Sequence, residues 1–187
     1  MTNNFIPDAV ITPEDNNSWK DFFKVQGLPY WWYRNSKGEK LFIVVKQTRH
    51  KNGKIIKSFF QGSLGSNGRF ARENLWKHVK DFKYPLYRVK QLLETDKPIF
   101  FAEGEASADT AQKLFPDHLV TTYSCGKGSF TKSDLSVLKG REVVLWPDSD
   151  HDGKGLVAYT NFALHLKEEY GVIAKLVPIP TYDAIQS

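Results

Sequence analysis

The spacing of hydrophobic and polar residues divides the chain into two parts. From residue 30 onward, short runs rich in aromatic and β-branched residues predict strands at residues 30–34, 40–47 and 54–61. Polar turns separate these runs, one at residues 35–38 and one at Asn52-Gly53. An Asn-Gly pair between extended runs is typical of a tight β-hairpin. The first part is therefore predicted to contain an antiparallel sheet.

The second part alternates apolar runs with segments of helical period. Strands are predicted at residues 99–102, 119–123, 142–146 and 172–177. Helices are predicted at residues 106–115 and 155–170, with a short helix after Thr131. Strands separated by crossovers favour a doubly wound parallel sheet. The predicted fold class is α/β: a four-stranded parallel sheet with flanking helices, preceded by a smaller α+β subdomain with antiparallel strands.

The expected domain organisation follows these patterns. The parts are an N-terminal arm, a subdomain, an α/β domain and a tail or start of a linker, at residues 1–28, 29–95, 96–180 and 181–187. The arm has one plausible helix near residues 17–25. In the subdomain, a glycine-rich loop is expected at residues 62–68, and helices at residues 71–81 and 86–95.

The composition is that of a folded protein, and it limits where in the cell we expect the protein. Of the 187 residues, 41% are apolar and 14% are aromatic, which suffices for a buried core. No run approaches the roughly 18 consecutive apolar residues of a membrane helix, and Met-Thr-Asn-Asn begins no signal region. We therefore expect a cytoplasmic protein with no membrane partner. The single cysteine, Cys125, excludes an internal disulfide and a cysteine-rich zinc ribbon within this chain.

Charge is distributed in blocks. Residues 34–90 hold fifteen Lys or Arg side chains against three acids, whereas residues 91–187 hold nine against fourteen. Aromatic residues interleave with the basic block or directly precede it. Basic charge with exposed rings is one way in which proteins hold single-stranded nucleic acid. A solvated lysine-rich surface has the same composition, so both interpretations stay open.

Three carboxylates at alternate positions, Asp148, Asp150 and Asp152, follow the apolar run at residues 143–146. Carboxylates held close together repel one another unless a metal or a proton intervenes, which favours a hard divalent cation. Glu103 follows the run at residues 99–102. Because functional groups collect outside the carboxyl ends of parallel strands, Glu103 and Asp148 are expected to converge at one edge of the sheet.

Other interpretations compete for these segments. The Asp-x-Asp-x-Asp-Gly pattern begins like an EF-hand calcium loop, but Tyr159 stands where that loop needs a bidentate Glu, and a strand precedes the loop. A solvated turn would use the same residues, although Glu103-Gly104 at the matching end of another strand weakens that interpretation. The segment around Lys127 lacks the glycine and Ser/Thr positions of a phosphate loop. It is better explained as a flexible turn whose lysine reaches phosphates.

Taken together, these segments resemble a known family. Phe-Phe-Ala-Glu-Gly-Glu, then Val-Val-Leu-Trp-Pro-Asp-Ser-Asp and a helix after Asp152-Gly153, resemble the TOPRIM domain shared by bacterial-type primases, topoisomerases and certain nucleases. The resemblance covers about residues 97–180 and implies a Rossmann-like fold. Residues 146–150 look most like the phage and plasmid primases. Residues 84–88 are similar to the region upstream of TOPRIM in primases of mobile elements.

The resemblance implies metal-dependent nucleotidyl chemistry with Mg²⁺ or Mn²⁺, with two ions expected. Glu103 would take the family's acid/base role, and Asp148 and Asp150 would hold metal, with Glu103 and Asp152 as further ligands. Basic residues are candidates for gripping the template or nascent strand, and Lys127 for the nucleotide phosphates. The strand-binding candidates are Arg49, Lys51, Lys54, Lys57, Arg69, Arg72 and Arg88. For each of them a plain surface charge remains an equal alternative.

Primases of this type commonly carry an N-terminal zinc-binding domain, and a helicase domain often follows. With one cysteine this chain has no zinc ribbon, so we expect a fragment of a larger replication protein or a partner-dependent one. Expected partners are single-stranded DNA, ribonucleotides, a replicative helicase and a zinc-binding domain in cis or in trans.

Three functions are therefore considered. The first is a primase module that makes short RNA on single-stranded DNA. The second is a nuclease that uses the same metals, and the third is a non-catalytic binding or assembly module with a vestigial acidic site. A topoisomerase is disfavoured because strand passage needs a large gate and an attacking tyrosine domain that this length does not supply.

Overall fold

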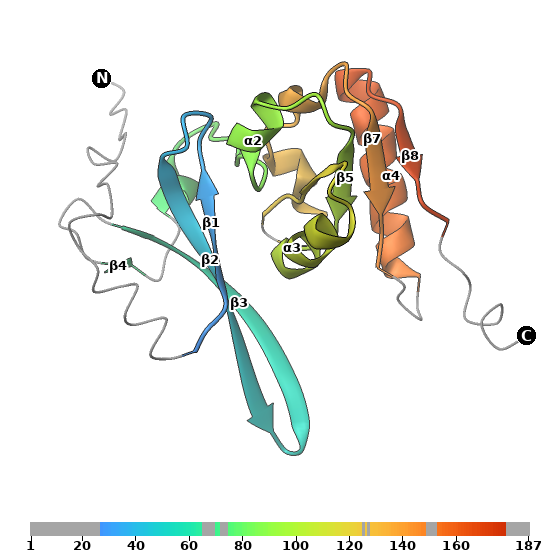
Figure 1. The fold of residues 1–187 in the computed structure, drawn as a ribbon. Coiled ribbons are helices and arrows are strands. Elements are labelled where there is room, and N and C mark those ends of the chain that lie inside the picture. Colours follow the sequence, from blue (N-terminus) through green and yellow to red (C-terminus); the bar gives the residue numbers. More distant parts are fainter. Residues whose placement is uncertain are drawn as a thin grey trace, which may run out of the picture. The chain divides into compact units, whose positions relative to one another are not determined.

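A computed structural model describes residues 27–64, 70–71, 75–124, 126, 128–148 and 153–178 (Figure 1). The chain divides into two units, Met1–Phe82 and Lys83–Ser187. The sequence places a boundary near residue 95 instead, but Leu86 and Leu92 lie in the main core of the second unit. The helix expected near residues 17–25, most of the N-terminal arm and the C-terminal tail lie outside the described residues.

The first unit contains an antiparallel sheet in the order β1-β2-β3-β4. Its strands are β1 (Tyr30–Arg34), β2 (Lys40–Lys51), β3 (Lys54–Leu64) and β4 (Phe70–Ala71). In β1, buried Trp31 and Tyr33 alternate with more exposed neighbours, as successive side chains of a strand point to opposite faces. Tyr33 stacks on Phe42 of β2, with 4.7 Å between ring centroids.

The β2–β3 hairpin turns at Asn52-Gly53, where the φ angles are 50° and 73°. A type I′ turn needs positive φ at both central residues, so the hairpin prediction is confirmed. Both strands are longer than predicted. Because β3 runs on to Leu64, the loop expected at residues 62–68 is wrong for its first three positions, and residues 65–69 lie outside the described residues.

Part of this hairpin extends beyond β1. Pairing of β1 with β2 ends at Tyr30↔Val45, and the Lys46 N–H then bonds to the Pro29 carbonyl at 2.9 Å. Pairing of β2 with β3 continues to Lys51↔Lys54. We call residues 46–51 and 54–59 the ribbon, because β2 and β3 are the two strands that pair there in the described part of the chain (Figure 1).

The helix predicted at residues 71–81 is wrong. Ala71 belongs to β4, which pairs with Ser63 and Leu64 of β3, and only Leu75–His78 form a 3₁₀ helix. Asp81 has a φ of 58°, a left-handed conformation that no α-helix contains. Residues 72–74 lie outside the described residues.

The second unit contains a four-stranded parallel sheet in the order β6-β5-β7-β8 (Figure 1). Its strands are β5 (Ile99–Ala102), β6 (Leu119–Thr121), β7 (Val143–Trp146) and β8 (Ala174–Leu176). All four residues of β5 are buried, as its unbroken apolar run predicts for a central strand covered on both faces. The predicted α/β class, a parallel sheet with flanking helices after an antiparallel sheet, is confirmed.

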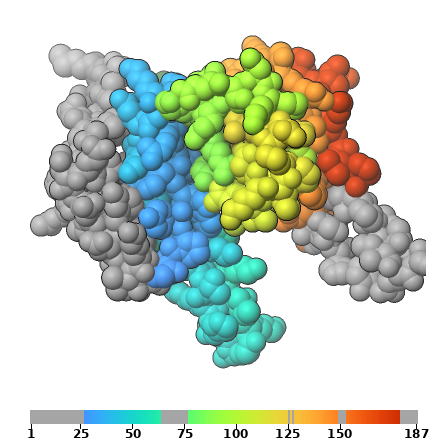
Figure 2. All heavy atoms as spheres, viewed as in Figure 1, coloured from blue at the N-terminus to red at the C-terminus, as the bar shows by residue number. Residues whose placement is uncertain are grey.

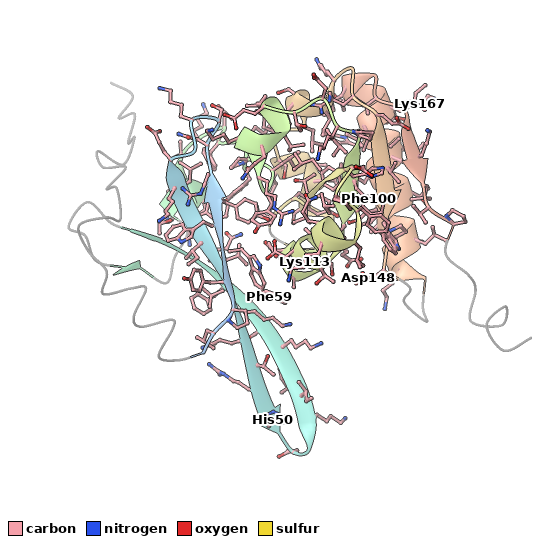
Figure 3. All side chains as sticks on the ribbon, viewed as in Figure 1. His50, Phe59, Phe100, Lys113, Asp148 and Lys167 are labelled. Atoms are coloured by element: carbon pink, nitrogen blue, oxygen red, sulfur yellow. The ribbon has the colours of Figure 1, made fainter. Side chains whose placement is uncertain are left out.

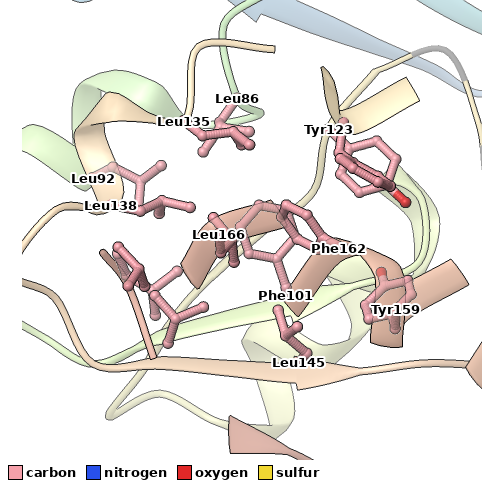
Figure 4. Close-up of a cluster of buried hydrophobic side chains, with 14 residues drawn as sticks. Leu86, Leu92, Phe101, Tyr123, Leu135, Leu138, Leu145, Tyr159, Phe162 and Leu166 are labelled. Carbon is pink, nitrogen blue, oxygen red and sulfur yellow. The ribbon is translucent and has the colours of Figure 1, made fainter. Parts of the chain in front are cut away.

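Helices cover both faces of this sheet. They are α2 (Val89–Leu93), α3 (Glu105–Leu114) and α4 (Lys154–Tyr170), with 3₁₀ helices at Ser129–Lys132 and Ser136–Leu138. On one face, Phe101 and Leu145 belong to a core cluster with Tyr159 and Phe162 of α4 (Figure 4). On the other face, Phe100 packs in a smaller cluster with alanines of α3.

The helix predicted at residues 86–95 is reduced to α2, because Arg88 before it adopts a left-handed conformation with φ of 63°. Among the helices of the described residues, none is long and apolar enough to cross a membrane.

Candidate active site

Two carboxylates meet at the carboxyl ends of β5 and β7. These strands are neighbours, and their last residues, Ala102 and Trp146, are paired. Glu103 follows β5 directly, and Asp148 follows β7 after one proline. The Asp148 backbone N–H donates to Glu103 Oε2 at 3.4 Å. The structure thus brings together the two predicted residues that it describes at this edge of the sheet (Figure 3).

Gly104 attaches the Glu103 segment to the third strand of this edge. Its N–H donates to the Thr122 hydroxyl at 3.2 Å, just beyond the end of β6. Its φ of 81° and ψ of 164° fall in a region that is essentially restricted to glycine. An added Cβ would meet nothing within 4 Å, so the requirement for glycine comes from the backbone alone. The chain can therefore turn from β5 into α3 directly after the carboxylate.

A pocket of about 420 Å³ opens beside the two carboxylates. It lies between α3 and the ends of β5 and β7, and a volume of this size suits a small-molecule ligand. Trp146 lies edge-on to Phe100 and Phe115, at 5.1 and 5.5 Å between centroids, and keeps 38% of its surface exposed. The pocket is lined by Ala102, Glu103, Ala106, Ser107, Thr110, Ala111, Leu114, Trp146, Pro147 and Asp148.

A buried tyrosine hydroxyl lies near the same carboxylates. Tyr159 of α4 is 1% exposed, and its hydroxyl has no hydrogen-bond partner among the described residues. Burial raises the pKa of Tyr159 well above its ordinary value, and the negative charges of Tyr123, Glu103 and Asp148 add to this shift. The charges of both carboxylates therefore act on one buried hydroxyl, which belongs to the core cluster on the α4 side of the sheet (Figure 4).

The donor set is compatible with a hard divalent cation. Glu103 and Asp148 offer carboxylate oxygens, which Mg²⁺ and Mn²⁺ prefer. Within the described ranges no group of three His, Cys, Asp or Glu side chains could hold a metal ion. The other two predicted ligands, Asp150 and Asp152, lie at residues 149–152, outside the described residues. The metal site stays a prediction with two of its four ligands placed.

Four of the predicted nucleic-acid contacts lie on the ribbon. These are Arg49, Lys51, Lys54 and Lys57, and all four are exposed. The structure therefore brings together residues that the sequence identifies only by charge. Lys127, Arg69 and Arg72 lie outside the described residues.

Arg88 differs from the ribbon residues because its guanidinium serves the fold. Nη2 donates to Asp109 at 2.6 Å, and Nη1 donates to the Val120 carbonyl at 2.9 Å. The Tyr87 hydroxyl donates to the same Asp109 oxygen at 3.0 Å, and burial together with the Asp109 charge raises the pKa of Tyr87 to about 12. Arg88 thus ties the start of α2 to α3 and β6, and its predicted strand contact stays a prediction.

Sequence reasoning missed two residues of this region. Trp146 carried a signal: in Val-Val-Leu-Trp the alternation of a strand puts Trp146 on the face opposite Leu145, but which face helices leave open is not visible in the sequence. Tyr159 was considered only as an argument against a calcium loop. Its burial near Glu103 and Asp148 depends on how α4 packs on the sheet, a contact between distant segments.

Comparisons with known proteins give limited information. No protein-family model matches the sequence, and a search of curated proteins found no match. Among solved structures, the chain is similar to one in the bacteriophage T7 lagging-strand DNA polymerase interacting with primase domains of two gp4 subunits bound to an RNA/DNA hybrid and dTTP. The TM-score is 0.43 at 15% identity, over 81% of each chain. A likeness of this size is too weak to assign a function.

Proposed function

We propose that this chain is a metal-dependent nucleotidyltransferase of the primase type, which makes short RNA on single-stranded DNA. One observation carries the proposal: the Asp148 N–H bonds to Glu103, so two carboxylates from separate strands stand at one edge of the sheet. The resemblance of residues 97–180 to TOPRIM sequences supports it, as do the basic residues of the ribbon. A phage, plasmid or other mobile element is the proposed genetic context.

Glu103 and Asp148 would hold the divalent metal, with Asp150 and Asp152 as further proposed ligands. Such ions, when bound as a pair, neutralise the charge that develops on phosphate oxygens and orient an in-line attack. Glu103 lines the pocket, where a carboxylate can also accept a proton from an attacking hydroxyl. The hydrogen bond from Asp148 N–H orients the Glu103 side chain for this role.

The pocket beside the carboxylates would receive the nucleoside of a metal-bound nucleotide. Its walls combine the exposed face of Trp146 with small side chains of α3, and aromatic rings stack on any base. Glu103, Asp148 and Trp146 all line this pocket, so phosphates bridged to a metal at the carboxylates would leave the base beside Trp146. Without a divalent ion the same carboxylates repel the phosphates, and nucleotide binding should require metal.

A test of this function uses a single-stranded template, ribonucleotides and Mg²⁺ or Mn²⁺. The chain should make short RNA, with its proposed helicase and zinc-binding partners added in trans if it is inactive alone. Asp148→Asn should reduce synthesis by at least about 100-fold, because it removes a metal ligand charge. Asp117→Asn, the same change at an exposed aspartate outside the site, should leave synthesis unchanged. If Asp148→Asn is as active as Asp117→Asn, the assignment of Asp148 to the metal site is wrong.

The same experiment distinguishes the other candidate functions. Cleavage of a labelled oligonucleotide without added ribonucleotides, lost in Asp148→Asn, would identify a nuclease that uses these carboxylates. Binding of DNA without synthesis or cleavage under either metal, equally strong in Asp148→Asn and with an unchanged salt dependence, would identify a non-catalytic module.

A further inference from the structure

The ribbon extends beyond the part of the sheet in which β1 pairs with β2. Among the described residues, no third strand pairs with β2 or β3 at residues 46–51 and 54–59, and a two-stranded hairpin contributes little stability by itself in water. Figure 2 shows this part of the first unit as a narrow projection, in cyan and teal. The length of the hairpin therefore calls for an explanation outside the folding of the first unit.

The charge of the ribbon limits the kind of partner that it can bind. The ribbon carries five basic side chains and no acidic one: Lys46, Arg49, Lys51, Lys54 and Lys57. Like charges opposite each other, as at Lys51↔Lys54, destabilise a strand pair. A polyanion that lies along the ribbon would relieve this repulsion, and nucleic acid is the polyanion that binds such surfaces through its phosphates.

The strand register divides the ribbon into two faces. Residues directly opposite each other in an antiparallel pair point to the same side, and neighbours along a strand point to opposite sides. The face that we call the Phe59 face holds Lys46↔Phe59, Thr48↔Lys57 and His50↔Ile55. The other, the Arg49 face, holds Gln47↔Ser58, Arg49↔Ile56 and Lys51↔Lys54.

The two faces differ in their apolar side chains. On the Phe59 face, Phe59 is 59% exposed and Ile55 is 61% exposed, whereas the Arg49 face exposes only Ile56, at 45% (Figure 3). Phe59 has Lys46 directly across the strand pair, at about 5 Å between Cβ atoms. Lys57 lies two residues along the same face, about 7 Å away. The Phe59 ring thus has one lysine across the strand pair and another along its own strand. A base stacked on the ring would have its phosphates within reach of both lysines.

We propose that the Phe59 face of the ribbon binds single-stranded nucleic acid, with a base stacked on Phe59 and phosphates held by Lys46 and Lys57. A single strand offers the faces of its bases, whereas a duplex keeps those faces stacked and presents only base edges in its grooves. An acidic protein would complement the positive charge of the ribbon. Charge complementarity alone, however, does not account for an exposed aromatic ring beside two lysines. The face would hold the template of the proposed function, and to that extent it rests on that function.

Binding is measured with the full chain and a fluorescent oligothymidylate of about 20 nucleotides, by anisotropy in EDTA, so that no metal-dependent chemistry contributes. Phe59→Ala should weaken binding by about tenfold or more, since stacking on one ring is worth roughly 5- to 100-fold. Ile56→Ala, a matched truncation on the opposite face, should change affinity less than twofold. Phe59→Trp should keep the affinity, and its added fluorescence should be quenched by the oligonucleotide.

Salt dependence and a duplex competitor complete the test. Lys46→Gln and Lys57→Gln should each lower the slope of log K against log salt by about 0.7, the value for one phosphate contact on a single strand. A duplex of the same length should bind more weakly than the single strand and be insensitive to Phe59→Ala. Equal losses in Phe59→Ala and Ile56→Ala, or equal binding of duplex and single strand, would overturn the proposal.

The outcome is separable from that of the proposed function. If Asp148→Asn abolishes synthesis while Phe59→Ala binds normally, the function stands and the Phe59 face is not the template surface. If Phe59→Ala loses binding while Asp148→Asn synthesises normally, the face stands and the assigned carboxylates are wrong.

Discussion

The parallel sheet of the second unit and the ribbon of the first differ in what surrounds them. Every residue of β5 is buried, and β5 has a paired strand on each side. The ribbon exposes Ile55, Ile56 and Phe59, and among the described strands its two halves pair with each other and with no third strand. Glu103 and Asp148 are therefore positioned by a packed core, whereas the ribbon side chains are positioned by strand register alone. Substitutions in the two regions should separate stability from binding.

The largest contrast concerns two phenylalanines. Phe101→Ala should lower the free energy of unfolding by about 3–5 kcal/mol, because it leaves a cavity beside Phe162, whose ring centroid lies 5.0 Å from that of Phe101. Phe59→Ala should change it by less than about 0.5 kcal/mol, because this ring is exposed. Urea denaturation followed by circular dichroism measures both, and equal losses would remove the distinction between the two regions.

A smaller effect is expected at two glycines. Gly104→Ala should cost about 1–3 kcal/mol, because its backbone conformation is essentially restricted to glycine. Gly53→Asn, at the tip of the hairpin, should cost less than about 0.5 kcal/mol, because its φ of 73° lies in the left-handed region that Asn adopts routinely. Thermal unfolding compares them. A tolerated Gly104→Ala would mean that the segment after Glu103 can relax.

Arg88 tests whether basic residues of the two units have different roles. Arg88→Met should lower stability by about 1–2 kcal/mol, since it removes charge-assisted hydrogen bonds that are only partly exposed to solvent. The affinity for oligothymidylate should change less than twofold. Lys57→Gln should do the reverse, with weaker binding at unchanged stability. If Arg88→Met loses binding when the folded fractions of variant and wild type are equal, Arg88 is a nucleic-acid contact after all.

A smaller effect than that of Arg88→Met is expected at neutral pH for Tyr159→Phe. Its hydroxyl has no partner among the described residues, so stability at pH 7 should stay within about 1 kcal/mol of the wild type. The raised pKa of Tyr159 means that the folded state holds this proton more tightly than the unfolded state does. Its contribution is fully present below about pH 10 and declines as the pH rises further.

Tyr159→Phe should therefore lose less stability above pH 10 than the wild type. Some alkaline loss should remain, because Tyr87, with a pKa of about 12, contributes in the same direction. Urea denaturation at pH 7, 10 and 11 measures both effects. A cost above about 2 kcal/mol at pH 7 would indicate that the hydroxyl has a hydrogen-bond partner outside the described residues.

Local sequence was sufficient for elements whose pattern matches their surroundings. The run Ile-Phe-Phe-Ala before Glu103 predicted a strand, and β5 is that strand. Asn52-Gly53 predicted a tight hairpin, and both residues have the positive φ of a type I′ turn. The convergence of Glu103 and Asp148 followed from the rule that parallel strands present their carboxyl ends at one edge.

Elements that depend on distant partners were predicted poorly. Residues 71–81 have a composition compatible with a helix. Ala71, however, pairs with β3 together with Phe70, so the start of the predicted helix is a strand. The shortened α2 has a similar cause, because Arg88 bonds to Asp109 and Val120, far along the chain. The pocket wall at Trp146 depends on which face of the sheet α3 leaves open. For Asp150, Asp152, Lys127, Arg69 and Arg72 the proposed roles stay predictions.

The strand order β6-β5-β7-β8 also has a consequence for the time at which each region forms. The hairpin joins residues close in sequence, and such hairpins form within about 1–10 μs. The parallel sheet joins Ile99 to Val143, and pairing across such a separation is slower. During synthesis the ribbon can therefore fold while β5 still lacks its neighbour β7. The strands that carry the basic surface can therefore pair before the two carboxylates are brought together.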